Sequence, residues 1–265
     1  MGSSDKNAMK KISYLMAGRA VIKIGGNEID DFSFLEQFIT LVKGMPVLPL
    51  IVHGGGKEIT DLLSQLGIKS EKIQGLRVTD ATGLRVTEMI LSGLVNKRLV
   101  KMLVMADLEA IGISGVDARL FQAQKLCIEG GDLGCVGTII GVNTHMVEQL
   151  LIEGFLPVIS PISIGIDGQV YNVNADSAAQ ALAEALQVER LVFITDVPGV
   201  KIGGKFQEML NTKDVEKNIQ SGEIYGGMIP KVRAALQAVQ KGVGSVVITN
   251  AQNFIAGKGT IIQNK

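Results

Sequence analysis

A lysine and two glycines at the end of a short apolar run are the first residues in this sequence that could do chemistry. Residues 21–26 read Val-Ile-Lys-Ile-Gly-Gly, and the apolar part has the length of a buried strand. The backbone can turn tightly at Gly25 and Gly26, so Lys23 would lie beside main-chain N–H groups that no side chain shields. A cation beside such amides suits a phosphate or a carboxylate. Taken alone, however, a lysine near a strand end is more often a solvated charge.

A second glycine cluster follows the next apolar run, because residues 53–56 read His-Gly-Gly-Gly. Two glycine-rich turns that lead towards helices can present backbone amides to an anion, although either turn could be a tight turn and nothing more. The cluster is not a Walker loop, since Glu58 stands where Ser or Thr is required, and no G-x-G-x-x-G opens a helix. A lipase-type hydrolase is excluded because no serine lies in a G-x-S-x-G elbow.

Residues 171–176, which read Tyr-Asn-Val-Asn-Ala-Asp, are predicted to run from a hairpin strand into a helix. Asn172, Asn174 and Asp176 alternate, so in an extended segment their side chains share one face. Three polar groups on one face beside apolar neighbours favour a binding site. The alternative is ordinary capping, since Asn and Asp are common at helix starts.

Two further cations stand near glycines. Gly226 and Gly227 precede a predicted helix that has Lys231 in its first turn. A lysine there opposes the helix dipole unless an anion is present, which suggests a phosphate. Arg77 could bind a carboxylate through both guanidinium nitrogens, although a surface arginine is the commoner interpretation.

Two lysines, glycine amides, one aspartate and an arginine suit the transfer of a nucleotide γ-phosphate to a carboxylate. The acceptor is already ionised at neutral pH, so no general base is needed. The reaction needs positioning and neutralisation of charge. A chain with only two histidines and two cysteines fits that requirement.

Composition excludes several other classes of function. The 265 residues include 26 basic and 26 acidic residues, so no basic excess points to nucleic acid. With three tyrosines, eight phenylalanines and no tryptophan, a base-stacking platform is not expected. Cys127 and Cys135 lack CxxC spacing, which favours reduced thiols in a cytoplasmic protein and no protein-bound metal. No apolar run reaches the roughly 18–20 residues of a membrane span.

The alternation of strand and helix patterns predicts an α/β fold, a three-layer αβα sandwich around a largely parallel sheet. The carboxyl ends of the predicted strands would then meet at one edge of the sheet, which is where ligands bind in such folds. These strands are 21–24, 47–52, 110–113 and 191–194. Asp167-Gly168 predicts a hairpin. Residues 82–107 predict a long helix with Gly83 and Gly93 as weak points. We expect a leader and N-terminal segment at 1–20, one lobe at 21–186 and a second at 187–265.

Seven ordered sequence blocks make the chain resemble the amino acid kinase family, in particular its members that phosphorylate N-acetyl-L-glutamate. The blocks are VIKIGG (21–26), VHGGG (52–56), GLRVTD (75–80), LVNKRLV (94–100), YNVNAD (171–176), TDVPGV (195–200) and GGMIPKV (226–232). The resemblance implies ATP-dependent phosphorylation of the side-chain carboxylate of N-acetyl-L-glutamate, the second step of arginine biosynthesis. It also implies an acetylglutamate-binding first lobe that dimerises and an ATP-binding second lobe.

The same resemblance implies roles for individual residues. Lys23 and Lys231 would stabilise the transition state, and Asp176 would orient both lysines. Magnesium would arrive on the ATP phosphates, without a protein cage. The implied substrate contacts are Gly55, Gly56, Arg77, Asn172 and Asn174, and the implied ATP contacts are Gly25, Gly26, Asp196, Gly199, Lys201, Glu223, Ile224 and Tyr225.

Two features differ from arginine-inhibited members of the family, which carry an extra N-terminal helix and a longer C-terminal segment. Here only residues 9–20 precede the first predicted strand, and the end at 250–265 is short. We therefore expect a homodimer that is insensitive to arginine. Two alternatives stay open: a sister kinase for another acyl-amino acid, such as carrier-bound aminoadipate, and a non-catalytic metabolite sensor on the same fold.

Overall fold

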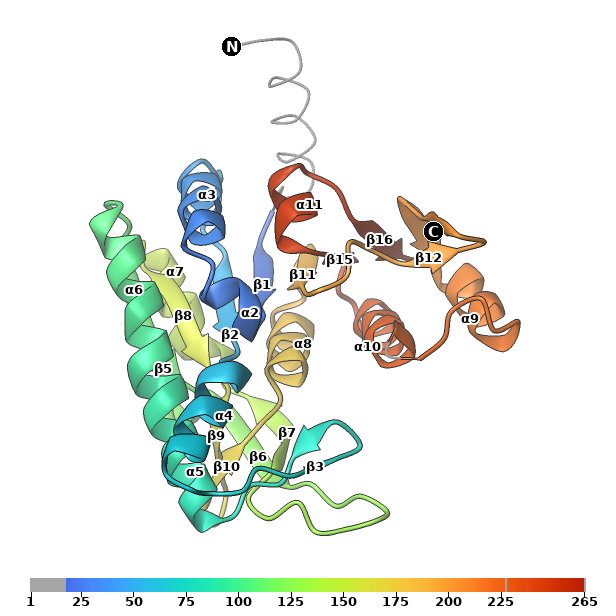
Figure 1. Ribbon diagram of the computed structural model, residues 1–265. Coiled ribbons are helices and arrows are strands. Elements are labelled where there is room, and N and C mark those ends of the chain that lie inside the picture. Colours follow the sequence, from blue (N-terminus) through green and yellow to red (C-terminus); the bar gives the residue numbers. More distant parts are fainter. Residues whose placement is uncertain (1–17, 227, 265) are drawn as a thin grey trace.

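An eight-stranded sheet forms the centre of the computed structural model, which describes residues 18–226 and 228–264 (Figure 1). The strand order is β14-β16-β15-β11-β1-β2-β8-β5, and every neighbouring pair is parallel except β15 with β16. The predicted largely parallel sheet is therefore confirmed. Of the leader and N-terminal segment expected at 1–20, residues 1–17 lie outside the described residues. The strands are β1 (Ala20–Ile24), β2 (Leu50–His53), β5 (Ala110–Ser114), β8 (Leu156–Ser160), β11 (Arg190–Ile194), β14 (Met209–Asn211), β15 (Ser245–Thr249) and β16 (Thr260–Gln263).

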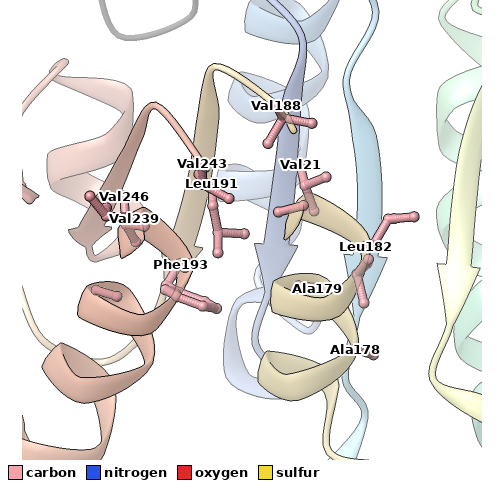
Figure 2. Packing of buried hydrophobic residues seen from close by; sticks show 14 of the residues in the cluster. Val21, Ala178, Ala179, Leu182, Val188, Leu191, Phe193, Val239, Val243 and Val246 are labelled. Carbon is pink, nitrogen blue, oxygen red and sulfur yellow. The ribbon is translucent and has the colours of Figure 1, made fainter. Parts of the chain in front are cut away.

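Helices cover both faces of this sheet. Successive residues of a strand point to opposite faces, so the apolar residues of one strand contribute to the cores on both sides. Val21 of β1 packs in one core cluster with α8 and α10, as Figure 2 shows for α8, while its neighbour Ile22 belongs to the other cluster, with α3 and α6. This confirms the three-layer prediction. The helices are α2 (Gly26–Ile29), α3 (Phe32–Lys43), α4 (Gly56–Gln65), α7 (Thr144–Ile152), α8 (Ala175–Leu186), α9 (Thr212–Gln220), α10 (Met228–Gln240) and α11 (Ala251–Ile255).

The long helix predicted over residues 82–107 is present but divided into three parts, and the middle part contains Gly93, one of the two predicted weak points. A seven-residue π-helix, η1 (Met89–Val95), separates α5 (Ala81–Glu88) from α6 (Asn96–Met105). The wider turn brings Leu91, Val95 and Asn96 into the buried interior. Hydrophobic periodicity could not show this, because a π segment changes which residues share a face.

A second, four-stranded sheet lies beyond the carboxyl ends of the central strands, in the order β10-β9-β6-β7. The predicted hairpin at Asp167-Gly168 is confirmed, since β9 and β10, the strands on either side of this turn, pair antiparallel. The sequence did not show that these strands form a separate sheet. Its strands are β6 (Phe121–Lys125), β7 (Gly137–Val142), β9 (Ile162–Gly165) and β10 (Val170–Asn172).

One predicted strand boundary is wrong, and two short hairpins complete the fold. Strand β2 begins at Leu50 and not at Val47, since Pro49 has no N–H to give to a sheet. Two short hairpins, which the sequence did not predict, are β3 (Lys72–Ile73) with β4 (Leu76–Arg77), and β12 (Lys201–Ile202) with β13 (Lys205–Phe206).

Candidate active site

The carboxyl ends of β1, β2 and β11 lie side by side, as predicted. Ile24 is in register with His53 on one side and with Ile194 on the other. The glycine turns after β1 and β2 and the Thr195-Asp196 pair after β11 therefore meet at one edge of the sheet. Ser114 ends β5 two strands further on, opposite Ser160.

Lys23 lies on the α8 side of the sheet and forms an ion pair there. Its Nζ is 2.8 Å from Oδ1 of Asp176, and only 13% of the Lys23 side chain is exposed. Asp176 lies in the first turn of α8, where the helix dipole favours a carboxylate. The pair fixes the lysine ammonium group beside the glycine turns.

The structure separates the two interpretations of residues 172–176. Asn172 ends β10, Asn174 is the N-cap of α8, and Asp176 is already helical, so the prediction of one extended face is wrong. The Asn174 side chain accepts hydrogen bonds from the N–H groups of Asp176 (2.8 Å) and Ser177 (3.2 Å), which confirms the capping alternative for this residue. As part of this helix start, Asp176 reaches Lys23.

A cavity of about 250 Å³ is lined by all five predicted substrate residues together with Lys23. Ile59, Leu91 and Val136 form apolar parts of its wall. The residues predicted from sequence that line it are Lys23, Gly55, Gly56, Arg77, Asn172 and Asn174. The site can therefore hold a small molecule with both charged and apolar parts.

Gly55 is required by the space around it. A Cβ built on Gly55 would lie 2.7 Å from Cδ2 of Leu91 and 3.2 Å from Cγ2 of Val95, both in η1. Such contacts are closer than carbon atoms tolerate without a shift of the backbone or of η1. The main-chain amides at the start of α4 thus remain uncovered by any side chain of their own, as an anion-binding turn needs.

Arg77 is bonded to α4 and also lines the cavity. Its Nη2 donates to the Gly56 carbonyl (2.9 Å) and to the Thr60 hydroxyl (2.8 Å), and its Nη1 donates to the Ser70 hydroxyl. Burial lowers the pKa of the guanidinium below its usual value, without removing its charge. Arg77 holds β4 to the glycine turn, a contact that the sequence did not predict.

Lys231 lies in the first turn of α10 and lines a second cavity, of about 440 Å³, which Asp176 and Asn174 also line. The two cavities are contiguous in their lining, since both include Leu76, Val136 and Asn174. Among the described ion pairs, Asp176 is joined to Lys23 and none includes Lys231. The structure thus pairs Asp176 with Lys23, while Lys231 lines a cavity that Asp176 also lines.

The predicted ATP residues divide between two places in the structure. Gly25 and Gly26 lie at the β1 end, and Asp196 lines another cavity of about 570 Å³ together with the buried Glu28. Glu223 lies beside the β12–β13 hairpin, because its carboxylate accepts a hydrogen bond from the N–H of Gly203 (2.9 Å). None of these three cavities is lined by residues of both groups.

The remaining predicted ATP residues lie around that hairpin. Gly199 packs against Thr260, and Lys201 lies 5.8 Å from the centre of the Phe206 ring. Ile224 is 2% exposed and belongs to the core, so its side chain is not available to a ligand, whereas Tyr225 is 76% exposed. Only the main chain of Ile224 could contact a nucleotide.

Sequence reasoning missed a buried pair behind the glycine turn. His53 and Asn96 are both fully buried, and His53 Nε2 lies 3.1 Å from Asn96 Nδ2. Burial lowers the pKa of His53 to about 4, so the imidazole is neutral at physiological pH. His53 and Asn96 both lie in sequence blocks on which the family resemblance rests, at 52–56 and 94–100. Their place in these blocks was the only sequence feature that could have indicated a role for them.

Within residues 18–226 and 228–264, no group of three or more His, Cys, Asp or Glu side chains is arranged to hold a metal ion. None of the helices in that part of the chain is long and apolar enough to cross a membrane.

The three-layer fold, the glycine turns and the Lys23–Asp176 pair agree with a family profile. The amino acid kinase family matches residues 18–250, and the chain belongs to that family. It is similar to the acetylglutamate kinase of Roseiflexus castenholzii, with 47% identity over 242 residues, 91% of this chain and 93% of that protein. The acetylglutamate kinase of Methanopyrus kandleri is 43% identical over 251 residues, which are 92% of this chain and 99% of that protein.

A solved structure agrees in fold. N-acetylglutamate synthase from Neisseria gonorrhoeae, in complex with coenzyme A and N-acetylglutamate, superposes with a TM-score of 0.82 at 21% identity. The match covers 99% of this chain and 63% of that one. At this identity the likeness concerns the fold alone.

Proposed function

We propose that this protein is an ATP-dependent kinase that phosphorylates the side-chain carboxylate of N-acetyl-L-glutamate, giving N-acetyl-L-glutamyl 5-phosphate. The observation that carries the proposal is the Lys23–Asp176 pair beside the Gly54–Gly56 turn, with Lys231 facing the contiguous cavity. The similarity to acetylglutamate kinases over about nine-tenths of the chain supports the choice of substrate. The product belongs to arginine biosynthesis.

The chemistry follows from two anions that must approach each other. A carboxylate oxygen of the acceptor attacks the γ-phosphorus of ATP, the bond from that phosphorus to the β–γ bridging oxygen breaks, and ADP leaves. Lys23 and Lys231 neutralise the charge on the moving phosphoryl group from two sides, and the amides of Gly55 and Gly56 add hydrogen-bond donors. The acceptor is ionised at neutral pH, so no residue has to remove a proton.

Each part of the substrate has a place in this proposal. The acyl-amino acid occupies the 250 Å³ cavity, where Arg77 and Asn172 contact its polar groups and the apolar wall contacts the acyl group. ATP lies over the carboxyl ends of β1 and β11 and reaches Glu223 and Tyr225, in a second lobe that begins near Gln187. Approach of that lobe would bring Lys231 towards the phosphates.

Magnesium fits this site as a companion of the nucleotide. Asp176 is already paired with Lys23, and no described cluster of carboxylates is arranged as a cage. Magnesium bound to the ATP phosphates supplies further neutralisation of their charge. Gly25 and Gly26 approach the same phosphates with main-chain amides.

We also propose a homodimer in the cytoplasm. The outer face of the α5–η1–α6 rod exposes four large apolar side chains, and a stripe of this kind is typical of protein contacts. A second copy of the same rod would cover it symmetrically. The exposed side chains are Met89, Leu94, Val104 and Met105.

The proposal is tested by trapping the acyl phosphate with hydroxylamine while ADP release is followed. N-acetyl-L-glutamate should give both products, and glutamate, aspartate, aminoadipate and carrier-bound aminoadipate should give little of either. Preference for carrier-bound aminoadipate would assign the chain to the sister activity. Binding of ATP and acetylglutamate without any acyl phosphate would make it a sensor.

A further inference from the structure

The fully buried pair of His53 and Asn96 lies directly behind the glycine turn. His53 Nδ1 is 2.9 Å from the carbonyl oxygen of Gly54, and its Nε2 is 3.1 Å from Nδ2 of Asn96. Asn96 Nδ2 also donates to the carbonyl of Val158 in β8 (2.9 Å). The pair therefore connects the turn to α6 and to the next strand of the sheet.

These contacts determine which imidazole nitrogen carries the proton. Nδ1 faces a carbonyl oxygen, which can only accept, so Nδ1 must donate. Nε2 faces an amide NH₂ group, which donates, so Nε2 must be unprotonated. The neutral Nδ1–H form satisfies both neighbours, and the charges of Lys97 and Arg98 further oppose a second proton.

The tautomer in turn determines how the turn faces the cavity. In a trans peptide the C=O of one residue and the N–H of the next point in opposite directions. When His53 holds the Gly54 carbonyl on the buried side, the N–H of Gly55 must point away from it, towards the cavity. The Gly54 N–H is held separately by the carbonyl of Ile24 (3.0 Å), so the peptide units on both sides of Gly54 are fixed.

We propose that His53 is a positioning residue for phosphoryl transfer: its Nδ1–H group orients the Gly55 N–H towards the transferring phosphoryl group. Asn96 selects the Nδ1–H tautomer of His53. The inference rests on the proposed kinase function and extends it to a residue that does not touch substrate. Without the Nδ1–H donor, the glycine-rich turn is free to flip its peptide units.

Two variants of His53 separate positioning from packing. His53→Asn keeps an N–H donor close to the position of Nδ1, whereas His53→Leu fills similar space without any donor. We expect kcat with acetylglutamate to fall about 10²–10³-fold in His53→Leu, the usual effect of losing one such donor, with little change in either KM. His53→Asn should recover most of that loss, while equal losses in the two folded variants, or an unchanged kcat in His53→Leu, would overturn the proposal.

The tautomer itself is measured on the unchanged protein, so a variant that fails to fold does not prevent a decision. In ¹⁵N-histidine NMR spectra we expect His53 to carry its proton on Nδ1 and to keep it there from about pH 8 to about pH 5.5. A proton on Nε2, or titration within that range, would contradict the inference. If the tautomer is as expected but the wild type forms no acyl phosphate, the kinase function is wrong and the hydrogen-bond arrangement stands.

Discussion

At the scale of single residues, the site depends on charges that neighbouring groups hold in place. The position of the Lys23 side chain is determined by its ion pair with Asp176 at 2.8 Å and by burial of most of the side chain. A lysine held in this way is neither a base nor a nucleophile in the proposed reaction. It is a fixed positive charge that contributes to catalysis only when a phosphoryl group lies nearby.

Replacing Lys23 tests that assignment. Lys23→Met removes the ammonium group and keeps the length of the side chain, so we expect kcat to fall by roughly 10³-fold, because the phosphoryl charge loses one of its two lysines. Steady-state kinetics of acyl phosphate formation measure this. Lys43→Met is the matched control, because Lys43 pairs with the exposed Asp107 away from the site, and it should retain wild-type turnover.

His53 predicts how stability depends on pH. Its pKa is about 4 in the folded protein and 6.5 in the unfolded chain, so between these values the unfolded chain binds a proton that the folded protein does not. The free energy of unfolding should therefore fall as pH falls from about 6.5 to about 4, by on the order of 3 kcal/mol from this residue.

Urea unfolding at several pH values measures that slope. His53→Asn should show a smaller acid-side loss of stability than the wild type, because it cannot bind the proton. His145→Asn should behave as the wild type does, since His145 is exposed. An identical pH dependence in wild type and His53→Asn would contradict the neutral, buried imidazole.

At the scale of elements, the sequence predicted the parts that follow regular periodicity or lie at strand ends. The sequence predicted the central strands β1, β2, β5 and β11, the hairpin at Asp167-Gly168 and the edge where the glycine turns meet, but not the edge strand β14. The π-helix was not predicted, because nothing in apolar spacing marks the extra residue that it inserts. Nor could spacing show that Asn172 and Asp176 belong to different elements, since a capping Asn174 and an alternating one look alike in sequence.

The contact between η1 and the glycine turn gives an element-scale prediction. Gly55→Ala places a methyl group against Leu91 and Val95, so either the turn or η1 must shift. We expect kcat to fall by more than about tenfold and stability by about 1–3 kcal/mol. Gly44→Ala, at the exposed C-terminal end of α3 with a φ of −88° and ordinary contacts only, should change neither quantity appreciably.

At the scale of the whole molecule, the α5–η1–α6 rod has two functions in our account. Its inner face shapes the cavity through Leu91, and its outer face carries the apolar stripe of the proposed dimer. Met105 is 77% exposed and Leu94 55% exposed, which a second copy would explain.

Sedimentation velocity tests the dimer. We expect the wild type to sediment as a dimer of 28.2 kDa chains, and a variant carrying Leu94→Glu with Met105→Glu to sediment as a monomer, because two buried like charges would face each other. Ile166→Glu is a control, since Ile166 is 88% exposed in the β9–β10 turn. A wild-type monomer would contradict the proposed assembly.

The central claim is that a carboxylate oxygen of the acceptor attacks phosphorus directly, between two placed lysines. N-acetyl-L-glutamate labelled with ¹⁸O in its side-chain carboxylate tests this claim. After turnover, hydroxylamine attacks the acyl carbon and releases inorganic phosphate together with the oxygen that joined carbon to phosphorus. Mass spectrometry should find one ¹⁸O in that phosphate, and unlabelled phosphate, formed by water attack on ATP, would contradict the account.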